Sequence, residues 1–381
     1  MSNLQEDTFL NAKVFLDEKY ILLSPDVPVT REMLDRLSRW GFQELYTEKG
    51  TGDSQEPIPV AKQAVNQVVV EQSLEEQKKQ KETLTYYHNC LAFLNETFDR
   101  YQLDNTLRLS VISDKIKEMK TFTRDYRQSI FSLSDSPVEG VSYNVCHSVK
   151  TVFLSLILAE TLKMPVHRQI ELGITALLHR IGMLRLPPEL YMANRRLRPE
   201  EKKALYAYPV LSFRIIKGAN FPMSVALGAL DHCERMDGTG YPRQLAGDKI
   251  SLYGKIISVT SSYTAAVARR PYKTGMDGHT GILDMIKLSG STYDHTILRA
   301  LVYTLSIFPI GTYVQLSDGS RGIVIRTDPE NPKYPFIKLI LNPQGAPFPE
   351  RPVFQPGEGN PVTISRPLTS EEKQEMDSYY K

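Results

Sequence analysis

The chain has 381 residues, which at roughly 150 residues per domain predicts more than one domain. Its 46 Lys and Arg residues nearly balance 44 Asp and Glu residues, leaving a net charge of +2. Composition therefore gives no support to a nucleic-acid partner held by bulk charge. The three cysteines have no C-x-x-C spacing, which argues against a disulfide framework and suits a reducing compartment.

The N-terminus shows no export signal, because Glu6 and Asp7 stand where a signal peptide carries positive charge before an apolar core. The longest nearly apolar stretch, residues 152–159, is far shorter than the roughly 20 residues that span a bilayer. We therefore expect a cytoplasmic protein without a membrane span.

The first third of the chain divides into two predicted parts. Extended runs near residues 12–23 and 42–46, with helical spacing between them, predict a small α+β module over residues 1–50. From Ala61 to Leu133 there is neither proline nor glycine, which predicts a helical linker or dimerisation region over residues 60–137. We expect solvated helices that connect modules or join copies in a homo-oligomer; a sensory pocket is the alternative.

The remainder divides into a helical bundle and a β module. Apolar residues recur at helical spacing from residue 140 to residue 307, which predicts an all-α bundle. After Pro309 the period changes to two, which predicts a small antiparallel β module over residues 308–381. Within the bundle, helices are expected near residues 145–157, 170–178, 199–205, 223–230, 252–269, 278–289 and 294–307; strands are expected near residues 312–316, 321–326, 336–341 and 362–365.

Three histidines lie on predicted bundle helices or at their ends: His147, His179 and His232, the last followed by Cys233. Imidazole is the commonest metal ligand in proteins, but each of these residues could equally be a packed, hydrogen-bonded histidine. The other four histidines have no supporting context: His88, His167, His279 and His295.

Three stretches of this region resemble the HD-GYP family: Leu-Leu-His-Arg-Ile-Gly-Met at 177–183, His-Cys-Glu-Arg-Met-Asp-Gly-Thr-Gly-Tyr-Pro at 232–242 and Arg-Arg-Pro-Tyr-Lys at 269–273. The resemblance covers about residues 140–305. It implies the all-α HD fold, an origin among bacterial cyclic di-GMP phosphodiesterases, and a centre of two or three iron or manganese ions.

The metal ligands of the family are only partly matched here. His147, His179 and His232 stand at histidine positions, and Met183 replaces the lysine that usually follows the HD pair. The remaining ligand positions carry other residue types: Tyr143, Arg180, Ser261 and Thr264 at acidic positions, and Tyr208 and Cys233 at histidine positions.

This replacement affects the chemistry that the resemblance implies. Two metal ions about 3.5–4 Å apart are bridged by anionic oxygens, which carboxylates supply. The guanidinium of Arg180 has no acceptor lone pair and stays positively charged. We therefore expect a pseudoenzyme, inactive or strongly impaired, that needs no cofactor; a single zinc ion held by His147, His179, His232 and Cys233 is the alternative.

Ligand and partner sites follow from the same resemblance. Arg270 and Lys273 match positions that face the guanine and phosphates of the ligand, and Arg180 could hold a phosphate directly, so these residues and Tyr241 are candidate ligand-binding residues. The alternative is that Arg270 is an ordinary charge at a helix end. The loop Gly240-Tyr241-Pro242 is implicated in contacts with GGDEF diguanylate cyclases, or serves simply as a packed turn.

The sequence is compatible with three functions. The chain is interpreted as a receptor or interaction scaffold in cyclic-dinucleotide signalling. The alternatives are a divergent metal-dependent cyclic di-GMP phosphodiesterase that uses the retained histidines, and a purely structural scaffold for another protein.

Overall fold

The computed structural model falls into two units, Met1–Val70 and Glu71–Lys381, which are described separately. The residues that it describes are 14–15, 21–23, 46–47, 62–133, 138–191, 193, 195–269, 275–328, 331–357 and 362–380. In the first unit, β1 (Val14–Phe15) pairs antiparallel with both β2 (Ile21–Leu23) and β3 (Tyr46–Thr47). The helix predicted between these strands lies outside the described residues.

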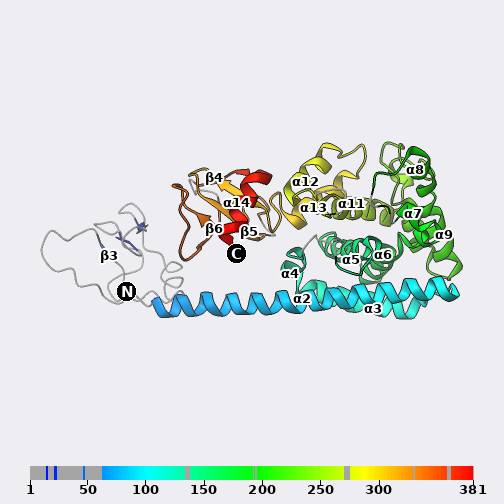
Figure 1. Ribbon diagram of the computed structural model, residues 1–381, viewed down its shortest axis with the longest axis horizontal. Coiled ribbons are helices and arrows are strands. Elements are labelled where there is room, and N and C mark those ends of the chain that lie inside the picture. Colours follow the sequence, from blue (N-terminus) through cyan, green and yellow to red (C-terminus); the bar gives the residue numbers. More distant parts are fainter. Residues whose placement is uncertain are drawn as a thin grey trace, which may run out of the picture. The chain divides into compact units, whose positions relative to one another are not determined.

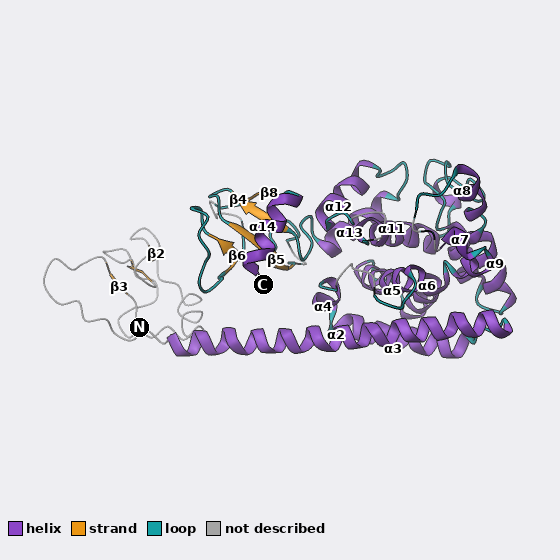
Figure 2. Ribbon diagram, in the orientation of Figure 1, coloured by secondary structure: helices purple, strands orange, loops and turns teal. Residues whose placement is uncertain are grey.

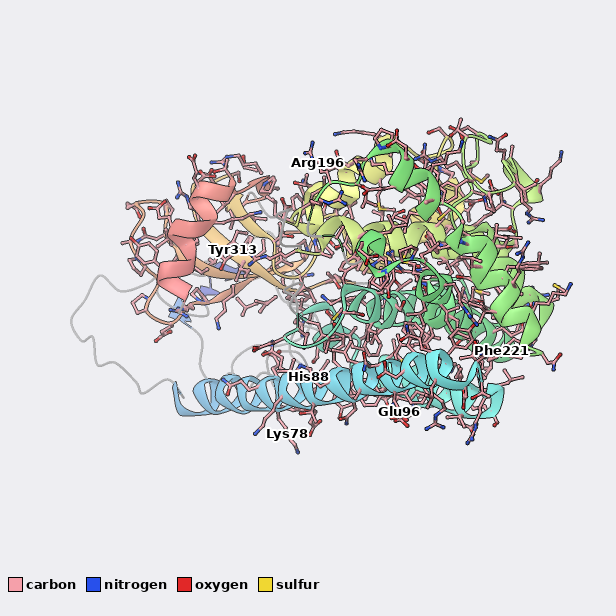
Figure 3. The ribbon with its side chains drawn as sticks, turned by 45° about the vertical axis from the view of Figure 1, so that its right-hand side comes forward. Lys78, His88, Glu96, Arg196, Phe221 and Tyr313 are labelled. Carbon is pink, nitrogen blue, oxygen red and sulfur yellow. The ribbon has the colours of Figure 1, made fainter. Side chains whose placement is uncertain are left out.

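The helical region expected as a linker forms part of the bundle wall. It consists of α2 (Lys62–Asp104), α3 (Leu109–Asp125) and α4 (Arg127–Phe131), and α3 packs on both α5 and α6 (Figure 1). Tyr87, Leu94 and Phe98 of α2 are at most 4% exposed and belong to the same apolar core as α5. Lys78 and Glu96 lie on the side of α2 that faces away from the bundle (Figure 3). The expectation of solvated helices is therefore wrong from Tyr87 onward, whereas a role of this region in linking modules or in dimerisation stays a prediction.

The bundle confirms the predicted all-α region. Ser142, Ser251 and Asp294 cap helices by accepting backbone N–H groups, as short polar side chains at such positions do. The helices are α5 (Tyr143–Thr161), α6 (Val166–Leu178), α7 (Pro188–Tyr191), α8 (Pro199–Leu205), α9 (Tyr208–Gly218), α10 (Met223–Asp231), α11 (Leu252–Val267), α12 (Gly278–Lys287) and α13 (His295–Leu305), with short 3-10 turns at Ile181–Arg185 and Gly247–Lys249. Of these, α7 and α9 were not predicted.

The C-terminal β module is also confirmed. Its five-stranded antiparallel sheet has the order β7-β6-β5-β4-β8, and α14 (Ser370–Tyr380) packs on β6 (Figure 2). The strands are β4 (Tyr313–Leu316), β5 (Arg321–Arg326), β6 (Phe336–Leu341), β7 (Val353–Phe354) and β8 (Ile364–Pro367). An ion pair of 3.3 Å joins Lys373 of α14 to Asp277, the residue that caps α12. In the described part of the chain, no helix has both the length and the apolar character needed to cross a membrane.

Candidate functional site

The three histidines singled out from the sequence lie together inside the bundle. His147 is in the second turn of α5, whereas His179 and His232 follow the last residues of α6 and α10. Their rings are at most 4% exposed. The centroid of the His179 ring lies 5.6 Å from that of His147 and 4.9 Å from that of His232. Helix ends from three different parts of the sequence therefore build one buried imidazole cluster.

Backbone carbonyls determine which nitrogen of two of these rings carries the proton. Nδ1 of His179 lies 2.7 Å from the Ala176 carbonyl oxygen, and Nδ1 of His232 lies 2.7 Å from that of Ala229. Because a carbonyl oxygen only accepts, both Nδ1 atoms donate, and in the neutral rings Nε2 keeps its lone pair. Burial, with the charges of His232 and Arg180, holds the pKa of His179 well below its ordinary value. Nε2 of His179 is buried and has no hydrogen-bond partner among the described residues.

The guanidinium of Arg180 lies near the rings of two tyrosines, Tyr143 and Tyr208. Its Cζ atom is 5.6 Å from the ring centroid of Tyr143 and 5.8 Å from that of Tyr208, both within the range of cation–π attraction. Nε donates to Asn144 at 3.2 Å, and a terminal nitrogen contacts the sulfur of Met183 at 3.3 Å. No carboxylate of the described chain forms an ion pair with Arg180, so its charge is balanced by aromatic faces and an amide.

A hydrogen-bonded group of three side chains occupies the other side of the cluster. The hydroxyl of Tyr208 lies 2.6 Å from Nε2 of His232 and 3.0 Å from Sγ of Cys233. Burial raises the pKa of Tyr208 well above its ordinary range, so the hydroxyl stays protonated. It donates a hydrogen bond to Nε2 of His232. On the opposite side, Nε2 of His147 lies 2.9 Å from the hydroxyl of Ser261.

The Gly240-Tyr241-Pro242 loop is packed against the end of α10. A Cβ atom on Gly240 would stand 2.4 Å from the Cα of Glu234, so only glycine fits this close approach. The Glu234 carboxylate accepts the backbone N–H of Arg243 at 2.7 Å, which closes the loop onto the helix. These contacts support the interpretation as a packed turn; contact with a GGDEF protein stays a prediction.

A cavity of about 120 Å³ begins one helical turn beyond the cluster. Lys150, three residues after His147, and Thr264, three residues after Ser261, both line it. The rest of its lining is mainly apolar, from α4, α5, α11 and the start of the β module. The buried cluster is therefore next to a hollow that has a cationic side chain in its wall.

Two contributors to the site were missed in the sequence. Asn144 holds Arg180, and Ser212 accepts the N–H of Gly182 and donates to the carbonyl of His179, both at 2.9 Å. Ser212 lies one turn after Tyr208 on α9, so recognising that helix would have revealed it. The predicted ligand-binding residues Arg270 and Lys273 lie outside the described residues.

Comparison with known proteins identifies the class. Residues 130–297 match the HD domain family. The cyclic di-GMP phosphodiesterase PdeB of Borreliella burgdorferi is 24% identical over 331 residues, which cover 87% of this chain and 85% of that protein. A cyclic di-GMP phosphodiesterase of Pseudomonas aeruginosa is 28% identical over 243 residues, which cover 63% of this chain and 58% of that protein.

Among solved structures, an HDG"Y"P protein from Bdellovibrio bacteriovorus is similar, with a TM-score of 0.45 and 15% identity over 79% of this chain and 96% of that chain. The family match places an HD domain at residues 130–297 of this chain. More narrowly, the motif residues and the curated relatives support the HD-GYP family of cyclic di-GMP phosphodiesterase-like proteins.

The expectation that the chain needs no cofactor is wrong for this family, because HD-GYP phosphodiesterases are metal-dependent. The unpartnered Nε2 of His179 is the kind of donor that a metal uses. The rest of the donor set does not fit the two-metal centre: in the described chain, no three His, Cys, Asp or Glu side chains are grouped so that they could hold a metal ion. The four residues of the zinc alternative do not point to one common position. His147 is within hydrogen-bond distance of Ser261, and both His232 and Cys233 are within hydrogen-bond distance of the Tyr208 hydroxyl.

Proposed function

We propose that this chain is a cyclic-dinucleotide receptor that binds its ligand through Arg180 and does not hydrolyse it. The observation that carries the proposal is the placement of a half-buried guanidinium, free of any carboxylate in the described chain, beside the histidine cluster. A guanidinium and a phosphate form paired, charge-assisted hydrogen bonds without activating water. Binding of this kind, without hydrolysis, does not require the chain to be free of metal.

The surroundings of Arg180 support binding more than catalysis. Hydrolysis by this fold needs anionic ligands that bridge metals and activate water, and Tyr143, Arg180 and Ser261 replace acidic residues of the family pattern. The tyrosine rings and Asn144 hold the guanidinium in place, which lowers the entropy lost when a phosphate binds. Arg270 and Lys273 remain proposed contacts to the same ligand.

Isothermal calorimetry with cyclic di-GMP at about 100 μM tests this proposal. Losing a charge-assisted hydrogen-bonded pair is worth about 1.5–3 kcal/mol, so Arg180→Ala should weaken binding by about ten- to a hundredfold. Arg299→Ala is the matched control, because Arg299 also lies over a tyrosine, Tyr303, but on α13. No binding by the wild type, or equal binding by Arg180→Ala, would refute the proposal.

A second candidate is a divergent metal-dependent phosphodiesterase, favoured by the unpartnered Nε2 of His179. Turnover of cyclic di-GMP with manganese, or with iron(II) under anaerobic conditions, measures it directly. Product formation that His179→Ala abolishes would establish this candidate and exclude the non-hydrolysing receptor. If neither nucleotide nor metal binds, the structural scaffold is the function to pursue.

A further inference from the structure

Two tyrosine rings form a stacked pair at the edge of the site. Tyr206 and Tyr241 have ring centroids 4.2 Å apart and an angle of 22° between their planes. Tyr206 follows α8 and is 46% exposed, whereas Tyr241 belongs to the Gly-Tyr-Pro loop and is half-buried. The inner ring therefore supports the outer one, and Tyr206 keeps a large aromatic surface in solvent.

The inner ring is connected to the site already described. Burial and the neighbouring Cys233 thiol raise the pKa of Tyr241 above the ordinary range, and the charge of Arg180 opposes that rise. Cys233 in turn contacts Tyr208, whose ring lies beside the Arg180 guanidinium. The stacked pair and the cation are thus two ends of one contiguous group of side chains.

The backbone keeps the pair in position. Gly240 has no room for a side chain, and the backbone N–H of Tyr241 donates to the carbonyl oxygen of Cys233 at 3.1 Å. Tyr206 is separated by one residue from Tyr208, which opens α9 and is buried. The turn from α8 to α9 therefore directs one tyrosine into the histidine cluster and leaves the other on the surface.

The surface beside Tyr206 is rich in basic side chains. Arg195 and Arg198 share the Glu201 carboxylate, at 2.8 Å and 3.0 Å. The other exposed basic residues of this segment form no ion pair in the described chain: Arg196, Lys202 and Lys203. Positive charge next to an exposed ring favours a ligand that is both anionic and aromatic.

We propose that the outer face of Tyr206 stacks on a purine base of the cyclic dinucleotide while Arg180 holds a phosphate. This inference rests on the proposed receptor function and adds a residue that contacts the base. Stacking on an aromatic ring is tolerant of base identity, because every base presents a π-face. Tyr206 therefore contributes affinity for nucleotides as a class, and the choice between purines is made elsewhere.

The test compares three variants by calorimetry with cyclic di-GMP. Tyr206→Leu keeps an apolar side chain but removes the ring, and should weaken binding by about five- to a hundredfold, as the loss of one stacked base predicts. Tyr206→Phe keeps the ring and should bind within about twofold of wild type. Tyr303→Leu is the matched control: Tyr303 is 44% exposed on α13, so the same substitution there should leave affinity unchanged.

The outcomes separate this inference from the function on which it rests. If wild type binds, Arg180→Ala binds at least about tenfold more weakly and Tyr206→Leu binds as wild type does, the receptor function stands and the role of Tyr206 is refuted. If Tyr206→Leu and Tyr206→Phe lose affinity equally, the ring is not what binds the ligand, and stacking on Tyr206 is refuted. If the wild type does not bind at all, both proposals fail together. Circular dichroism of each variant verifies that the fold is retained.

Discussion

Leu94 of α2 provides a direct test that the long helix is part of the bundle core. It is fully buried, with 0% exposure, and belongs to the apolar cluster that includes α5 and α6. Leu103, nine residues further along the same helix, is 86% exposed. Both leucines lie on the same helix and receive the same substitution, so the difference between the two variants reports mainly the loss of packing.

The expected magnitude follows from the burial of each side chain. Replacing a fully buried leucine by alanine removes its transfer free energy and leaves a cavity, at a cost of about 2–5 kcal/mol. At about 2–4 °C per kcal/mol for a domain of this size, a loss of about 3 kcal/mol lowers Tm by about 6–12 °C. Leu103→Ala should change stability by less than about 0.5 kcal/mol, as surface substitutions do.

Urea unfolding followed by far-ultraviolet circular dichroism measures both variants. Leu94→Ala should lower the transition midpoint without changing the slope, because the native fold and the surface exposed on unfolding stay the same. Equal midpoints for Leu94→Ala and Leu103→Ala would show that α2 does not share the core of the bundle. The helical region would then be the solvated connector that its charged sequence favours.

Further predictions concern the site and the buried core. Ser212→Ala should cost about 2 kcal/mol in urea unfolding, because it leaves the buried N–H of Gly182 and carbonyl of His179 without their partner; a loss below about 0.5 kcal/mol would contradict this. Burial raises the pKa of Cys90 from 9.0 to about 11, so this thiol should resist a disulfide reagent at about pH 8 until the chain unfolds. Since its folded pKa lies above the unfolded one, stability should fall as pH rises from about 9 towards 11, and Cys90→Ser should remove that contribution. Gly240→Ala should unfold at lower urea than wild type, since its Cβ would overlap the backbone, and an unchanged midpoint would refute the close packing.

The secondary structure was accessible from local patterns because helical and alternating periodicities are properties of neighbouring residues. The bundle helices and the hairpin of the β module were predicted close to their observed limits. Two of the helices that were not predicted, α9 and α14, were missed for local reasons. In α9 the second residue is Pro209, and proline usually indicates a break in a helical pattern; α14 has a strongly charged sequence with little apolar patterning. The path of α2 could not be inferred, because a charged amphipathic helix has the same pattern whether its apolar face meets its own domain or another copy.

The site divides in the same way. Sequence motifs alone pointed to the HD-GYP family, because the motifs consist of residue types at fixed spacing; the positions at which carboxylates are replaced stay a prediction. Only the folded structure shows that Arg180 lies near the rings of both Tyr143 and Tyr208, and that Nε2 of His179 has no hydrogen-bond partner among the described residues. Contacts between side chains far apart in the sequence depend on how helices pack, so the cation–aromatic group and the Tyr206–Tyr241 stack emerge only at the tertiary level.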